Sequence, residues 1–174
     1  IRDSMKPWKT RMNVFVMEMS TNKEERLTSS EARGIYGFTW LTDNRIGYVK
    51  DDGGNENMHF YAVNIDGTNE MDLTPFENIQ ARIIDDLEDD QNHLIIGLNK
   101  RNPQIHDPYR VNINDGTMKM IAENPGNISG WGTDHNGKLR IATTSDGVNT
   151  SLLYRDKESD KFKPILTTDF KVSV

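Results

Sequence analysis

Short apolar stretches recur along this chain, separated by polar residues and turn dipeptides. Four residues that open such stretches lie at successive offsets of 46, 48 and 44 residues: Phe15, Tyr61, Tyr109 and Leu153. A second apolar residue follows each of them twelve residues later, and these are Leu27, Leu73, Ile121 and Ile165. A repeat of this length built from short strands is typical of a β-propeller, in which each repeat forms one blade.

Runs of β-branched and aromatic residues predict the strands within each repeat. They fall near residues 13–19, 24–28, 36–41, 45–50, 58–65, 70–74, 81–87, 93–98, 108–113, 118–122, 128–133, 138–144, 151–155 and 162–167. Asp-Gly and Asn-Gly dipeptides between them suit tight turns, because these residues tolerate positive φ. Since no segment longer than about ten residues has a 3.6-residue apolar period, the chain is predicted to be all-β.

The order of these strands predicts a partial β-propeller of about three and a half four-stranded antiparallel blades. Residues 1–174 form one propeller segment, with blades at about 34–76, 79–123 and 127–168, and residues 13–28 supply the outer strands of a preceding blade. Residues 171–174 look like the approach to another inner strand. Because propellers close with about four to eight blades, we expect a piece of a longer protein, truncated at both ends. Its open blade edges favour self-association.

Two long stretches go beyond a generic propeller. They are residues 43–67, continuing to Asp72-Leu-Thr-Pro-Phe76, and residues 97–116, continuing to Ala122-Glu-Asn-Pro-Gly126. Together with Pro7-Trp8 and Asn13-Val-Phe-Val16, they resemble the N-terminal propeller of bacterial serine peptidases of the prolyl oligopeptidase family, particularly its acylaminoacyl-peptidase-like branch. A weaker resemblance is to TolB-type propellers, which share the blade ending Tyr61-Ala-Val-Asn-Ile-Asp-Gly67.

The resemblance implies a serine peptidase as the parent protein. In that family an α/β-hydrolase domain follows the propeller and carries a Ser, Asp, His triad, and the propeller gates the access of peptides to it. None of the triad positions falls within this chain, so no catalytic residue is assigned, and substrate-binding residues stay unknown. The expected partners are the chain's own C-terminal α/β-hydrolase domain and a peptide substrate. The alternative is a TolB-like propeller that acts as a protein-binding scaffold.

Composition narrows the classes of partner. The net charge is -6 and the pI is near 5.2, which disfavours a nucleic-acid partner. No apolar run approaches the roughly 18 residues that span a bilayer, so no membrane partner is expected. The absence of cysteine excludes thiol catalysis and disulfides, but it leaves open whether the compartment is the cytoplasm or the periplasm of a bacterium.

Side chains with catalytic or metal-binding chemistry are few and scattered. The string nearest to a Gly-x-Ser-x-Gly nucleophile elbow is Gly126-Asn-Ile-Ser129-Gly130, whose serine lies one place too late, so a structural role is favoured. The four histidines are scattered over the three predicted blades: His59, His93, His106 and His135. Because zinc recruits local pairs at fixed spacing, no metal and no cofactor are predicted. His59 and His93 are expected on strands, and His135 beside a hairpin turn.

The charged and aromatic clusters each allow a structural interpretation and a binding interpretation. The acidic clusters, Asp51-Asp52 with Glu56 and the run 85–90, are either solvated hairpins or sites that attract a cation, though neither matches a calcium-binding loop. Asp85 and Asp86 could also bias a channel against acidic peptides. The indoles of Trp40 and Trp131 are expected to pack between blades rather than to form a binding platform. Three arginines could meet a peptide carboxylate or form ordinary salt bridges: Arg33, Arg82 and Arg101.

Overall fold

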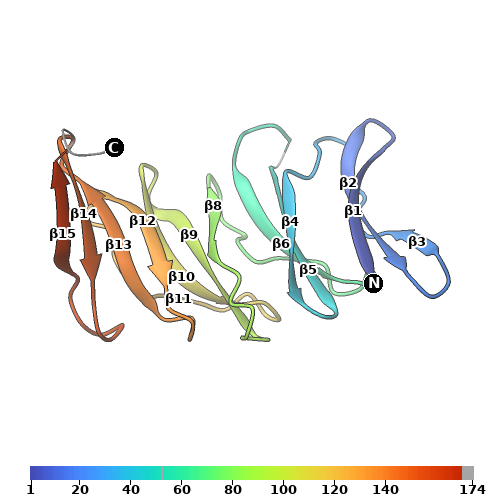
Figure 1. Cartoon of the computed structure of the whole chain (residues 1–174). Coiled ribbons are helices and arrows are strands. Elements are labelled where there is room, and N and C mark those ends of the chain that lie inside the picture. Colours follow the sequence, from blue (N-terminus) through green and yellow to red (C-terminus); the bar gives the residue numbers. More distant parts are fainter. Residues whose placement is uncertain (52, 170–174) are drawn as a thin grey trace. The chain divides into compact units, whose positions relative to one another are not determined.

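The computed structural model describes residues 1–51 and 53–169, and these residues form antiparallel sheets (Figure 1). The first sheet contains β1 (Arg2–Trp8), β2 (Arg11–Glu18) and β3 (Lys23–Arg26). The other three sheets have four strands each: β4 (Gly37–Thr42), β5 (Arg45–Asp51), β6 (Met58–Asn64) and β7 (Met71–Asp72); β8 (Ala81–Asp85), β9 (His93–Asn102), β10 (Ile105–Asn112) and β11 (Met118–Met120); and β12 (Ile128–Thr133), β13 (Leu139–Ser145), β14 (Asn149–Tyr154) and β15 (Lys163–Asp169).

The prediction of an all-β, partial propeller is therefore confirmed. Within the two described ranges there is no helix, and each sheet is an antiparallel meander whose strands follow one another in chain order. No helix of these ranges is long and apolar enough to span a membrane. Residues 171–174, predicted as the approach to a further strand, lie outside the described residues, and so does Asp52.

The chain divides into two compact units, which are described separately. The first unit contains residues 1–81 and the short segment Asn112–Thr117, and the second contains Arg82–Val111 and the described part of Met118–Val174. The first two sheets thus belong to the first unit and almost all of the last two to the second, the exceptions being Ala81 of β8 and the segment 112–117 that ends β10 and turns toward β11.

The core of the first unit lies between its two sheets. Val14 and Val16 of β2 pack with Ile46 and Tyr48 of β5, and all four side chains are buried. Their alternation along each strand follows from the two-residue period of a β-strand, which sends alternate side chains to one face. Burying apolar side chains of this size stabilises the fold by about 1.5–3 kcal/mol each.

One hydrogen bond recurs at the outer edge of both sheets of the first unit. The N–H of Val14 donates to Thr28 Oγ1, and the N–H of Phe60 donates to Thr74 Oγ1, both at 2.9 Å. Each threonine directly follows the second apolar residue of its repeat, Leu27 or Leu73. The threonine lies just after the outer strand, and its hydroxyl gives the buried N–H of the neighbouring strand an acceptor. This hydrogen bond explains why Leu-Thr recurs in the sequence.

An arginine joins separate segments in each unit. In the first unit, Arg45 donates to the carbonyl of Ile113 at 3.0 Å and to Asn64 Oδ1 at 2.6 Å. In the second unit, Arg155 donates to the carbonyls of Leu139 and Ile121, at 2.8 and 3.3 Å. Burial lowers the pKa of both guanidinium groups, but an arginine stays charged in proteins, so these contacts hold neighbouring sheets and turns together.

Candidate functional site

A cleft of about 560 Å³ in the second unit is the candidate site. Its walls are the segment 85–90, which follows β8, and the hairpin 133–138, which joins β12 to β13, with Arg110 of β10 between them. This volume lies within the range of about 300–1,000 Å³ that is usual for ligand pockets in proteins.

The segment 85–90 is held in place by its first carboxylate and by a strained leucine. Asp85 accepts hydrogen bonds from the N–H of Leu87 at 2.8 Å and from the hydroxyl of Thr133. Leu87 is buried and has a φ of 54°, a left-handed conformation that is costly for a side chain of this kind. Gly137 has a φ of 65°, which favours glycine, and a Cβ there would lie 2.6 Å from Leu87 Cδ2, so a larger residue would have to displace that side chain.

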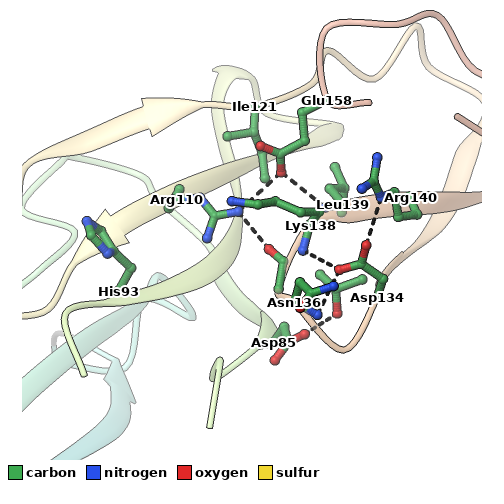
Figure 2. Close-up of polar contacts among 12 residues, drawn as sticks. Asp85, His93, Arg110, Ile121, Asp134, Asn136, Lys138, Leu139, Arg140 and Glu158 are labelled. Atoms are coloured by element: carbon green, nitrogen blue, oxygen red, sulfur yellow. Dashed lines mark hydrogen bonds and ion pairs between the residues drawn. The ribbon is translucent and has the colours of Figure 1, made fainter. Parts of the chain in front are cut away.

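The hairpin wall is organised around Asp134 (Figure 2). Its carboxylate accepts hydrogen bonds from Arg140 Nε at 2.8 Å and from the N–H groups of Asn136 and Lys138, each at 2.9 Å. The hydrogen bond from Arg140, with help from the backbone N–H groups, lowers the pKa of Asp134 below its ordinary value. The carboxylate therefore stays ionised, and its charge is matched by that of Arg140.

Arg110 bridges the hairpin to a third segment (Figure 2). It donates to the carbonyl of Gly137 at 2.7 Å and to Glu158 Oε1 at 3.1 Å. The same oxygen of Glu158 accepts the N–H of Leu139 at 3.1 Å. Since Arg110 and Arg140 are both engaged by partners within the unit, their positive charges are neutralised locally.

The acidic wall of the cleft keeps carboxylates without partners. Glu88 and Asp89 are exposed, and within residues 1–51 and 53–169 neither makes a hydrogen bond or an ion pair. Asp90 is shared with His93, whose Nδ1 lies 3.1 Å from Oδ2. Burial alone would raise the pKa of Asp90, but the N–H of Asn92 and the neighbouring His93 outweigh it and lower that pKa. The cleft therefore carries a negative field, which attracts cationic groups and disfavours anionic ones.

The four histidines lie on separate elements of the structure. His59 and His93 lie on β6 and β9 and His135 in the β12–β13 hairpin, as predicted. His59 Nδ1 is 2.8 Å from Asp72 Oδ2, whereas His135 lines the cleft. His106 is half-buried, and its Nε2 has no hydrogen-bond partner in the described ranges. No group of three or more metal-ligating side chains occurs among those residues.

The two predicted acidic clusters differ. Asp51 is buried rather than solvated: Arg33 Nε lies 3.8 Å from its carboxylate, which accepts no hydrogen bond among the described residues. Most of the run 85–90 instead lines the cleft, and its exposed residues are Glu88 and Asp89. The sequence pattern found this acidic run, but it carried no signal for Arg110 or Glu158, which tertiary contacts alone bring to the hairpin.

The tryptophans, arginines and serine considered as candidates lie away from the cleft lining, and most of them make packing contacts, ion pairs or hydrogen bonds within the fold. Trp40 packs on the core of the first unit and donates from Nε1 to Asp3 at 3.0 Å, while Trp131 lies 5.7 Å from the Phe162 ring. Arg101 forms an ion pair with the buried Asp107 at 2.9 Å. Arg82 is exposed on β8. Ser129 lies on β12, where its hydroxyl donates to the carbonyl of Thr143 at 3.2 Å.

Two curated proteins are similar to this chain in sequence. No family model matches the chain. Over 136 residues it is 29% identical to dipeptidyl aminopeptidase BIII of Pseudoxanthomonas mexicana, and the matched region covers 77% of this chain and 20% of that protein. Over 161 residues it is 24% identical to dipeptidyl peptidase family member 6 of Caenorhabditis elegans, with 85% and 21% covered. The chain thus spans about a fifth of the length of these curated relatives.

Solved structures agree on the fold. An oligogalacturonate lyase in complex with manganese matches with a TM-score of 0.66 at 13% identity, over 94% of this chain and 44% of that one. A putative TolB from Agrobacterium tumefaciens matches with a TM-score of 0.56 at 9% identity, over 92% and 58%. The chain therefore has the fold of a β-propeller segment, and the curated relatives that resemble it in sequence are dipeptidyl peptidases. The acylaminoacyl-peptidase-like branch stays a prediction.

Proposed function

We propose that this chain is the non-catalytic propeller portion of a serine peptidase and that it gates the access of peptides to a separate α/β-hydrolase domain. The observation that carries the proposal is the likeness to two dipeptidyl peptidases, which extends over most of this chain but only about a fifth of theirs. The chain has no Gly-x-Ser-x-Gly elbow, so its contribution is to select peptides rather than to cleave them.

The acidic cleft supports a selective role in the same peptidase. Its unpartnered carboxylates, Glu88 and Asp89, would favour peptides with cationic groups and repel acidic ones through their field. Such a field acts on the rate of association more than on the affinity, and it weakens as salt is added.

The test begins with the full-length gene, which should encode Gly-x-Ser-x-Gly, then Asp, then His, after this segment. The encoded enzyme should cleave short peptides faster than folded proteins, and the variant Glu88→Gln/Asp89→Asn should lose its preference for basic over acidic peptides at low salt. Lys119→Gln/Lys157→Gln, two changes outside the cleft, serves as the control. If the gene ends without a hydrolase domain, or if cleavage ignores substrate size, the gating role is wrong.

The second candidate is a TolB-like scaffold that binds a protein partner, and the fold shared with a putative TolB favours it. It predicts further blades without a hydrolase domain, and retention of a specific protein by the immobilised chain. Self-association through open blade edges is a further proposal. Ile165 and Leu166 of the edge strand β15 are 59% and 57% exposed, so light scattering should show a mass that rises with concentration. A mass that stays monomeric would contradict it.

A further inference from the structure

Another pocket lies in the first unit and shares no residue with the acidic cleft. Its volume is about 110 Å³, and its walls are residues 28–30 and Ile35 between β3 and β4, Tyr48 and Lys50 of β5, and Glu70 just before β7. Since one water molecule takes about 30 Å³, a pocket of this size has room for roughly three to four waters or for one small organic molecule.

Lys50 brings an ammonium group without an anionic partner to this pocket. Tyr48 and Lys50 lie on the same face of β5, because they are two residues apart, and Tyr61 of β6 faces Tyr48. Lys50 Nζ lies 4.2 Å from the centroid of the Tyr61 ring and 5.8 Å from that of the Tyr48 ring. The two rings attract the ammonium through their π faces. Among residues 1–51 and 53–169 this ammonium forms no ion pair and no hydrogen bond.

Glu70 brings a carboxylate that is only partly engaged. Tyr48 is buried, and its hydroxyl donates to Glu70 Oε1. Burial, together with this hydrogen bond, raises the pKa of Tyr48, so the hydroxyl keeps its proton and the carboxylate is the acceptor. Within the described part of the chain, Glu70 Oε2 accepts no hydrogen bond and the carboxylate forms no ion pair.

The two opposite charges line one pocket without pairing with each other. A ligand with a single charge would satisfy either Lys50 or Glu70 and leave the other group as it is. A ligand that carries both a carboxylate and an ammonium would satisfy both, and hydrogen bonds between charged groups are about twice as strong as those between neutral ones. The charges of the walls therefore match a small dipolar molecule.

Two serines of the same wall add neutral hydrogen-bonding groups. Ser29 Oγ accepts a hydrogen bond from Arg26 Nη2 at 3.3 Å, so its own proton remains available to a ligand carboxylate. Ser30 Oγ donates to the carbonyl of Arg33 at 2.5 Å, so its lone pairs remain available to a ligand ammonium. The pocket thus offers a neutral donor and a neutral acceptor beside its two charges.

We propose that this pocket binds a small α-amino acid, such as glycine or alanine, in its zwitterionic form. The ligand carboxylate lies at Lys50 and the ligand ammonium at Glu70. This site is independent of the peptidase role, because all its residues belong to the first unit and none lines the cleft. With so few contacts available, we expect a dissociation constant of about 1 mM.

The experiment is a titration of the 174-residue chain with glycine at low ionic strength, followed in proton–nitrogen correlation NMR spectra. The amide signals of Ser29, Ser30 and Glu70 should shift and saturate, while those of Gly137 and Lys138 in the cleft should stay in place. Acetate and methylammonium each carry only one of the two charges of glycine. Both should bind about tenfold more weakly than glycine, or weaker still.

Two variants separate the two charges. Lys50→Gln should weaken glycine binding about tenfold or more and leave methylammonium binding unchanged, because Glu70 is retained. Glu70→Gln should weaken glycine binding to a similar degree and leave acetate binding unchanged, because Lys50 is retained. A variant that had merely lost its fold would bind neither. Matched controls are Lys23→Gln and Glu25→Gln, the same changes at an exposed ion pair of β3, and both should bind glycine as the unaltered chain does.

Three results would overturn the proposal. The first is a glycine titration that does not saturate or that leaves the signals of Ser29 and Ser30 in place. The second is acetate or methylammonium that binds as tightly as glycine, because the pocket would then take a simple anion or cation. The third is folded Lys50→Gln or Glu70→Gln that binds glycine as before. The comparison of the three ligands on the unaltered chain decides the matter even where a variant does not fold.

Discussion

The first and second sheets of the first unit are copies of one repeat with different completeness. Both end in the same Leu-Thr cap, with the same 2.9 Å hydrogen bond from a buried N–H. Yet the first sheet has three strands and Ser4 where the second has four and Tyr48. The outer strands of both sheets thus form by pairing between strands that are close in sequence. How deeply their side chains are buried depends on the neighbouring strands and sheets. Three predictions test this difference and one concerns the second unit, and they run from the largest expected effect to the smallest.

The largest effect should come from the buried centre of the second sheet. Phe60 is fully buried, and a Cβ at Gly47 would lie 2.4 Å from its ring, so the ring fills the space that the glycine leaves. Phe60→Ala should lower the free energy of unfolding by about 3–5 kcal/mol, measured by urea denaturation. The matched change in the first sheet, Val14→Ala, should lower it by less. A loss as large as that of Phe60→Ala would contradict this expectation, because Val14→Ala removes far fewer buried carbon atoms.

The two threonine caps should behave alike despite this difference. Thr28→Val and Thr74→Val each leave a buried N–H without its acceptor, which should cost about 1–3 kcal/mol of stability. Urea denaturation measures the loss, and amide exchange at Val14 and Phe60 should quicken in the respective variant. If only Thr74→Val were destabilising, the cap would depend on the complete sheet rather than on the repeat.

Acid should affect the sheet β8–β11 of the second unit through His106. Burial, with a contribution from Arg82, lowers the pKa of His106 below 6.5. The unfolded chain then binds the proton more readily than the folded one, so stability should fall as the pH drops below about 6.5. Hydrogen exchange should quicken first in β8–β11, and His106→Asn should remove this part of the pH dependence. A variant with an unaltered pH profile would contradict the assignment.

The smallest effect should come from the surface of the first sheet. Lys6 forms an ion pair with Glu24, and their side chains are 46% and 31% exposed. Exposed pairs contribute about 0–1 kcal/mol, so Lys6→Ala should change the midpoint of urea unfolding only slightly. The control is Glu24→Gln in the same assay. A loss as large as that of a threonine cap would show that β1 depends on this contact.

The sequence predicted most strands because their signals are local. Turn dipeptides such as Asn136-Gly137 and the apolar alternation around Phe60 need only a few neighbouring residues to act. β1 was missed because Arg2–Trp8 has polar residues at most positions and becomes a strand only by pairing with β2. The cleft was predicted only in part, since the acidic run was visible but its partners Arg110 and Glu158 come from distant segments.

By itself, the sequence determined the repeat, its turns and the threonine caps, because these depend on strand periodicity and on hydrogen bonds at fixed offsets. Tertiary structure alone decided which carboxylates stay unpaired in the cleft, and that Asp51 is buried near Arg33. Such features depend on which segments meet in space, and no local pattern encodes the distances between them.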